Sequence, residues 1–211
     1  MTPVVALRDA VVVAGGFPLL AGVTLEIAPG TGTLLVGANG AGKTSLLRLL
    51  GGLERLAAGE GSVLGLDLRR ADRRDLRRRV GWLGHDGSFY DDLSARENLR
   101  FAADALGRPR ELVDAALERV GLTPRAATPT RRLSAGQRRR LALAWLVVRR
   151  AELWLLDEPY AALDEDGRAL LDELLVDVVA SGGTVVASAH DPVRSPAITA
   201  TVRLAGGRVV P

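Results

Sequence analysis

A glycine-rich segment with one lysine carries the clearest chemical signal in the chain. It runs Gly37-Ala38-Asn39-Gly40-Ala41-Gly42-Lys43-Thr44-Ser45 and fits G-x-x-x-x-G-K-[ST], the spacing of a phosphate-binding loop. Glycines let the chain turn so that backbone N–H groups point at phosphate oxygens, and the following helix adds partial positive charge. Lys43, the only lysine in the chain, can reach the β- and γ-phosphates of a nucleotide, and the Thr44 hydroxyl can ligate Mg²⁺. The segment therefore predicts a nucleotide site.

Two adjacent carboxylates follow an apolar run farther along the chain. Leu153-Trp154-Leu155-Leu156 predicts a buried strand, and Asp157 and Glu158 come directly after it. The carboxyl edge of a parallel sheet is where α/β proteins bind ligands. We expect Asp157 to hold Mg²⁺ through its water shell and Glu158 to polarise an attacking water as a general base. A strand ending in two solvated acids is the plain alternative, which the phosphate-binding loop in the same chain disfavours.

A parallel sheet would bring these residues together, and the flanking patterns predict one. Apolar runs at 33–36, 80–83, 153–156 and 184–189 predict its buried strands. Upstream, runs at 4–7, 11–13 and 23–27, with a turn at 15–18 between the last two, predict an antiparallel meander. The segments 201–204 and 208–210 predict a C-terminal hairpin.

Helical patterns fill the interval between the predicted strands at 80–83 and 153–156. The capping boxes Ser94-x-x-Glu97 and Ser134-x-x-Gln137 open two helices, and Pro109 opens another. A further helix is expected from Gly167 to Ala180. The chain, 1–211, is thus expected to form a single α/β domain. It would combine a mainly parallel sheet, an N-terminal antiparallel β-subdomain and a helical subdomain inserted at approximately 88–150.

The amino-acid composition limits the classes of protein to which the chain can belong. The 211 residues are 47% hydrophobic, which is enough for one full core, and cysteine is absent, which excludes disulfides and thiol chemistry. The longest apolar run, 141–148, is far shorter than the ~20 residues that span a bilayer, and the start lacks a signal-peptide pattern. Arginines between 69 and 79 alternate with Asp72 and Asp75, which predicts a solvated helix face with local ion pairs. Contact with anionic lipid headgroups or with a partner's acidic surface is the alternative.

The segment Leu133-Ser134-Ala135-Gly136-Gln137 resembles the signature sequence of the ATP-binding cassette (ABC) ATPases. Alone, Ser134-x-x-Gln137 is a capping box and nothing more. The order of phosphate-binding loop, helical insert, signature, Asp-Glu strand and histidine, however, resembles the ABC pattern over nearly the whole chain. Within it, Ala161-Ala162-Leu163-Asp164 resembles the D-loop and His190 the switch histidine.

The resemblance implies the P-loop NTPase core of an ABC ATPase, with ATP and Mg²⁺ as ligands. It implies a homodimer or pseudo-dimer arranged head to tail, in which the phosphate-binding loop of one protomer faces the signature of the other. Ser134 and the N–H groups of Gly136 and Gln137 would then receive the γ-phosphate at a helix N-terminus. Asp164 would link the two sites. His190 would contact the γ-phosphate and the attacking water, acting with Lys43 and Glu158.

Three positions depart from the family pattern. His85 occupies the Q-loop position, where the family has glutamine, and it is either a polar surface residue or a contact to the metal or to a coupling element. Ala14 stands where an adenine-stacking aromatic is usual, so Phe17 either stacks on the base or is a turn residue. Ala135 replaces a glycine of the signature, and its one added methyl need not block the N–H donors.

Within the family, Gly84-His85 and the segment 93–101 are similar to the ATP-binding subunits of cytochrome c maturation haem exporters. This similarity implies integral membrane transporter subunits as partners and a cytoplasmic protein held at the membrane's cytoplasmic face by them. Direct haem or nucleic-acid binding is not expected. Phe89 and Tyr90 are candidates either for a groove that accepts a partner's helix or for the core.

Other functions remain open on the sequence alone. One is another small ABC exporter. A second is a soluble ABC ATPase that remodels a protein or nucleic-acid complex, although translation-associated relatives carry two cassettes on one chain. A third is a P-loop kinase, which would have no use for the signature helix.

Overall fold

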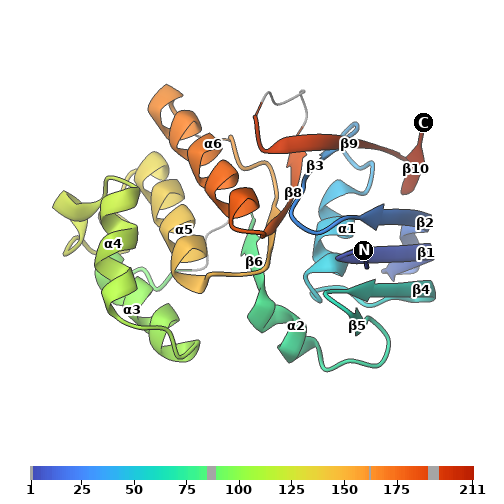
Figure 1. Ribbon diagram of the computed structural model, residues 1–211, viewed down its shortest axis with the longest axis horizontal. Coiled ribbons are helices and arrows are strands. Elements are labelled where there is room, and N and C mark those ends of the chain that lie inside the picture. Colours follow the sequence, from blue (N-terminus) through green and yellow to red (C-terminus); the bar gives the residue numbers. More distant parts are fainter. Residues whose placement is uncertain (1, 85–88, 162, 190–194) are drawn as a thin grey trace.

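The computed structural model describes residues 2–84, 89–161, 163–189 and 195–211. Six strands form a central sheet in the order β10-β9-β3-β8-β7-β6, in which every neighbouring pair is parallel except β10 with β9 (Figure 1). The strands are β3 (Gly32–Val36), β6 (Val80–Leu83), β7 (Leu153–Leu156), β8 (Thr184–Ala189), β9 (Ile198–Ala205) and β10 (Arg208–Val210). Every residue of β3, β7 and β8 is buried, as expected for strands covered on both faces.

A second, antiparallel sheet has the order β2-β1-β4-β5. Its strands are β1 (Val5–Ala14), β2 (Phe17–Ile27), β4 (Ala58–Val63) and β5 (Leu66–Asp67). The runs at 4–7 and 11–13, predicted as separate strands, belong to the one strand β1, which is irregular near Asp9. Asp9 has φ 48°, and its N–H donates to Thr24 Oγ1 at 3.0 Å, so a side chain supports the irregularity. The turn predicted at 15–18 is shorter, because β2 begins at Phe17.

Helix α1 (Lys43–Leu50) lies between the two sheets (Figure 1). Its leucines at 46, 47, 49 and 50 are buried, since they face apolar side chains on both sides. Helix α2 (Arg73–Arg79) precedes β6 and buries only Leu76, which agrees with the solvated face predicted from its arginines. The Asp72 side chain caps α2 by accepting the Arg74 N–H at 2.8 Å.

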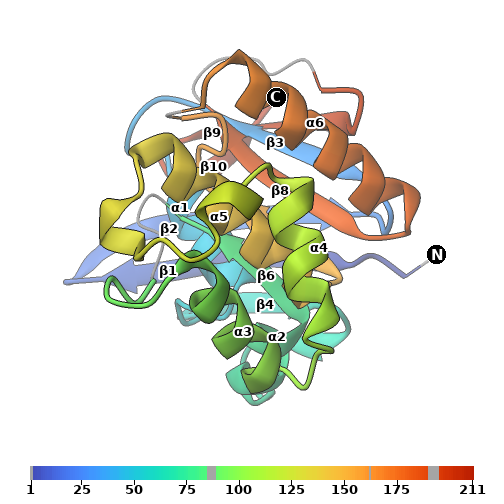
Figure 2. The ribbon, with the colours of Figure 1, turned by 90° about the vertical axis from the view of Figure 1, so that its left-hand side faces the viewer.

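Helices α3 (Ala95–Ala105), α4 (Glu111–Arg119) and α5 (Ala135–Arg149) form a group on the side of the molecule away from the antiparallel sheet (Figures 1 and 2). Short 3₁₀ turns at Thr123–Arg125 and Thr130–Arg132 connect α4 to α5. Helix α6 (Glu165–Ala180) joins β7 to β8. Both predicted capping boxes, at Ser94 and Ser134, are present.

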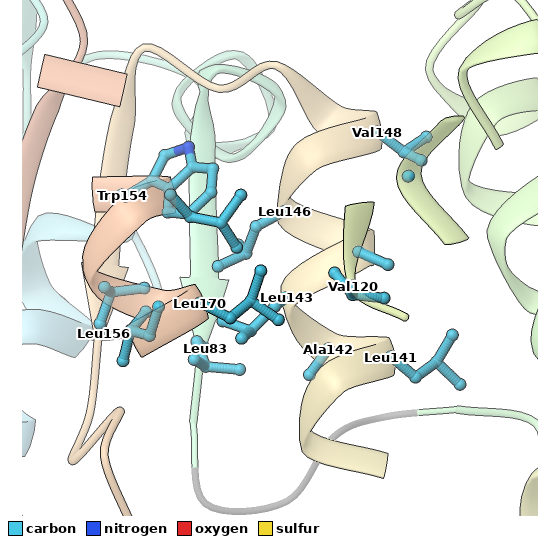
Figure 3. Packing of buried hydrophobic residues seen from close by; sticks show 14 of the residues in the cluster. Leu83, Val120, Leu141, Ala142, Leu143, Leu146, Val148, Trp154, Leu156 and Leu170 are labelled. Carbon is cyan, nitrogen blue, oxygen red and sulfur yellow. The ribbon is translucent and has the colours of Figure 1, made fainter. Parts of the chain in front are cut away.

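Helix α5 connects this group of helices to the central sheet. Figure 3 shows Leu143 and Leu146 of α5 in the same buried cluster as Trp154 of β7 and Leu170 of α6. The signature helix is therefore fixed against the strand that carries the two acids. Among the residues that the structure describes, no helix is both long and apolar enough to cross a membrane.

Candidate nucleotide site

The predicted site residues follow the carboxyl ends of adjacent parallel strands. The strands end close together: Leu83 is opposite Leu156 and Val36 is opposite Ala189, while β8 extends two residues beyond the end of β7. The phosphate-binding loop follows β3, and Asp157 and Glu158 follow β7, so both lie at one edge of the sheet. His85 and His190 come after β6 and β8 but lie outside the described residues.

Two glycines of the phosphate-binding loop hold positions that no other residue would fit without strain. Gly37 has φ 154°, and a Cβ there would lie 2.3 Å from Leu204 O. Gly42, with φ 105°, is the N-cap of α1. Lys43 is 6% exposed, and its Nζ donates to Gly37 O at 2.6 Å and to Ala38 O at 3.1 Å. The loop therefore holds its own ammonium group at the helix N-terminus, where an anion is favoured.

Asp157 and Thr44, predicted as metal ligands, are in contact. Thr44 Oγ1 donates to Asp157 Oδ2 at 2.8 Å, and Asp157 is 2% exposed. The other carboxylate oxygen accepts a hydrogen bond of 2.6 Å from Ser188 Oγ of β8. A buried carboxylate beside a hydroxyl supplies the hard oxygen donors that Mg²⁺ requires. The residues present thus fit this ion.

Ser188 also contacts Glu158 and was missed by the sequence analysis. Its Oγ accepts the Glu158 N–H at 3.0 Å, so one hydroxyl connects the main chain of one acid to the side chain of the other. The available signal was a hydroxyl that follows a run of apolar residues in a predicted strand. Glu158 itself has φ 47°, a left-handed conformation that is uncommon for a residue other than glycine and that clusters at functional sites.

Arg139 of α5 is the second residue that the sequence analysis missed. It is buried, and its guanidinium donates to the main-chain carbonyls of both acids. Burial lowers the pKa of Arg139, and the negative charges of Asp157 and Glu158 partly oppose this shift.

The signature residues open α5 through a capping box. Ser134 Oγ accepts the Gln137 N–H at 3.2 Å, and Gln137 Oε1 accepts the Ser134 N–H at 3.1 Å. A phosphate would therefore compete with Ser134 for the Gln137 N–H. A pocket of about 440 Å³ lies here, lined by Ser134, Gly136, Gln137, Arg140 and Asp164 among others. No residue of the phosphate-binding loop, which is described throughout, lines it.

Asp164 caps the next helix at the same pocket. Its Oδ1 accepts the Gly167 N–H at 2.8 Å and lies 3.5 Å from Arg140 Nη2. The hydrogen bond from Gly167 is the main reason that the pKa of Asp164 is lowered, and Arg140 adds to the effect. The proposed D-loop residue thus stays ionised and bordered by the signature helix.

Phe17 is 76% exposed at the start of β2. Its strand borders the phosphate-binding loop, because a Cβ at Gly42 would lie 3.1 Å from Leu19 O and from Leu20 Cδ2. An exposed aromatic ring on this strand is compatible with base stacking, which stays a prediction.

The sequence profile of the ABC transporter family matches residues 20–161. The chain belongs to this family. An ABC relative from Rhodopseudomonas palustris (strain HaA2), named cytochrome c biogenesis ATP-binding export protein CcmA, is 45% identical over 181 residues, 85% of this chain and 88% of the relative. A protein of the same name from Hyphomonas neptunium is 39% identical over 96% of this chain and 97% of its own length.

Solved ABC cassettes share the fold. The ATP-binding cassette MJ0796, in a dimeric post-hydrolysis state bound to ADP and Pi, has a TM-score of 0.88 and 25% identity, over 97% of this chain and 96% of that one. The protein cbiO1 from Clostridium perfringens, part of the ABC transporter complex cbiONQ, has a TM-score of 0.85 and 26% identity, over 100% of this chain and 88% of that one. The expected fold is confirmed, and the chain is an ABC-type ATPase.

Proposed function

We propose that this ATPase drives a membrane transporter that acts in cytochrome c biogenesis, through haem export or release of a haem-loaded chaperone. The observation that carries the ATPase part is the contact between Thr44 and Asp157, which joins the phosphate-binding loop to the acidic end of β7. The named role of the relatives supports the assignment to cytochrome c biogenesis. The alternative is that the chain is the ATP-binding subunit of another small ABC exporter.

The residues of one protomer divide the work of hydrolysis. The loop amides and Lys43 bind the phosphates of ATP, and Phe17 stacks on the base. Glu158 accepts a proton from the attacking water, and His190 orients that water and the γ-phosphate. Mg²⁺, held by Thr44 and Asp157, would neutralise charge on the phosphate oxygens.

A second protomer completes each site in our proposal. The signature pocket at Ser134 lacks any phosphate-loop residue in its lining, which supports a head-to-tail dimer in which it receives the partner's γ-phosphate. Asp164 lies in the same pocket and would connect the two sites. His85, at the Q-loop position, would contact the metal or the element that couples the ATPase to the transporter. The helical segment at approximately 88–150 would act as a subdomain of the single domain 1–211.

The test uses Glu158→Gln, which keeps the size of the side chain and removes the base. We expect Mg-ATP to convert monomer to dimer in light scattering, while phosphate release falls by about 10²–10⁴-fold. The matched control is Lys43→Ala, which should neither bind ATP nor dimerise. A Glu158→Gln protein that stays monomeric and hydrolyses ATP at the wild-type rate would contradict the proposal.

We further propose that the membrane subunit docks in a groove between the core and the helices. The groove has a volume of about 530 Å³, and its lining includes the aromatic side chains of Trp82, Phe89 and Trp145. The Phe89 and Trp145 rings meet edge to face, with centroids 5.8 Å apart. Tyr90 instead packs on Phe101 at the surface.

Arginines make the described part of this groove basic. Arg74, Arg77, Arg78 and Arg149 line it, and no described lining residue is acidic. These charges suit a partner helix that carries both apolar and acidic side chains. Such docking would hold the chain at the cytoplasmic face of the membrane.

Charge reversal tests the groove. Arg77→Glu combined with Arg78→Glu should lower co-sedimentation with transporter-containing membranes by about tenfold, because two attractive charges become repulsive. Arg69→Glu combined with Arg70→Glu is the matched control, since these exposed arginines precede α2 and do not line the groove. Equal losses in both variants would show that the chain binds lipid headgroups rather than a subunit in the groove.

A further inference from the structure

One buried guanidinium joins three segments of the candidate site. Arg139 lies in the second turn of the signature helix and is 9% exposed. Its guanidinium donates to four main-chain carbonyls: Nη1 to Gly84 O at 2.8 Å, Nη2 to Glu158 O at 2.8 Å and Asp157 O at 3.4 Å, and Nε to Pro159 O at 3.3 Å. The contact thus ties α5 to the end of β6 and to the acids after β7.

The geometry of this contact suits a rigid link. Guanidinium is planar and presents five N–H donors in a fixed fork, so carbonyls bound to it cannot move independently. Gly84 immediately precedes His85 at the Q-loop position, and Arg139 is five residues beyond Ser134 of the signature. Arg139 therefore connects the segments that contain His85, Glu158 and Ser134. These are the residues expected to contact the metal, the attacking water and the partner's phosphate.

The backbone conformation of Glu158 depends on contacts such as the one from Arg139. Its left-handed backbone, φ 47°, persists only where its surroundings hold it in place. Ser188 Oγ fixes the N–H of Glu158 and Arg139 Nη2 fixes its carbonyl oxygen, so the peptide groups on both sides of the Cα are held. This backbone sets the position of the Glu158 Cβ, from which the side chain with the carboxylate extends.

We propose that Arg139 is a positioning residue that holds Glu158 in its left-handed conformation and makes the placement of this base depend on the signature helix. Engagement of Ser134 by the partner's nucleotide would shift α5, and Arg139 would transmit that shift to Glu158. The inference rests on the proposed role of Glu158 as the general base.

The test compares Arg139→Met and Arg139→Lys with the wild-type enzyme. Because the phosphate-binding loop is untouched, we expect the Kd for ATP to stay within about twofold, while kcat falls by about ten- to a hundredfold through misplacement of the base. Arg139→Lys, which concentrates its donors on one nitrogen, should give an intermediate kcat. Arg138→Met is the matched control: this neighbouring arginine pairs with Asp91 at 3.1 Å instead, and its loss should leave kcat unchanged.

A double-mutant cycle separates positioning from a general structural role. If Arg139 acts through Glu158, Arg139→Met combined with Glu158→Gln should be no slower in single-turnover hydrolysis than Glu158→Gln alone. Additive losses, or a wild-type kcat in Arg139→Lys, would overturn the inference. If Arg139→Met does not fold, Arg139→Lys carries the test. A wild-type rate in Glu158→Gln alone would instead overturn the proposed function.

Discussion

Tyr160, two residues beyond Glu158, fixes the segment after the acids to α6. Its Oη donates to Asp172 Oδ1 at 2.5 Å, and its ring packs against the core. Burial raises the pKa of Tyr160, and the neighbouring carboxylate of Asp172 raises it further, because both disfavour a phenolate. The folded state therefore keeps a neutral phenol at a pH where the unfolded chain ionises.

The sign of this shift predicts a loss of stability at alkaline pH. A raised folded pKa contributes stability that is complete below the unfolded pKa of about 10 and is lost as the pH rises above it. In urea titrations between about pH 9 and 11, the free energy of unfolding should fall by up to about 1.4 kcal/mol per pH unit more in wild type than in Tyr160→Phe. The chain has one lysine and two tyrosines, so few other groups titrate there. Parallel pH profiles would contradict this account.

Single residues differ in how far the sequence could predict their places. Lys43, Thr44 and Asp157 belong to patterns of fixed spacing after apolar runs, so their meeting at one sheet edge could be predicted. Ser188 and Arg139 reach the acids from at least 30 and 18 residues away, through contacts that depend on strand order and helix docking. No local spacing encodes those contacts.

At the scale of elements, the N-terminal caps of helices α3 and α5 can be compared. Helices α3 and α5 both begin with a serine in a complete capping box, but only Ser134 lines the signature pocket. Ser94→Ala and Ser134→Ala should each lower the free energy of unfolding by about 1 kcal/mol, because each removes a helix cap. Only Ser134→Ala should also lose ATP-driven dimerisation and hydrolysis.

Two measurements check this pair. Urea midpoints give the stability cost, and light scattering with phosphate release gives the functional one. Equal hydrolysis rates in the two variants would show that Ser134 serves only as a helix cap. The local pattern S-x-x-[EQ] predicts both caps equally well, and only the order of motifs along the chain sets Ser134 apart.

Element boundaries were predictable where local chemistry sets them. The apolar runs at 80–83, 153–156 and 184–189 agree with β6, β7 and β8, because buried parallel strands read as continuous apolar segments. The single strand β1 was missed, because Arg8 and Asp9 interrupt its apolar pattern while hydrogen bonds to β2 and β4 continue on both sides. Pairing across the sheet overrides the local signal there.

At the scale of the whole molecule, the two halves of the proposed catalytic site lie on different parts of the surface. The phosphate-binding loop follows β3, whereas the signature pocket is lined by residues of α5 and of the segments before α6 and after α4. In a head-to-tail dimer with two-fold symmetry, the phosphate-binding loop of each protomer would face the signature pocket of the other. Each site then takes one half from each chain.

This division predicts that two inactive variants restore each other. Lys43→Ala removes the loop lysine and Ser134→Ala the signature hydroxyl, so two copies of either variant form no intact site and should not dimerise with ATP. A mixed dimer collects both defects in one site and leaves the other intact. At equal concentration, mixed dimers should then recover up to about half of the wild-type rate of phosphate release, because each of them carries one intact site of two. If each chain completed its own site, mixing would recover nothing, and the head-to-tail arrangement would be wrong.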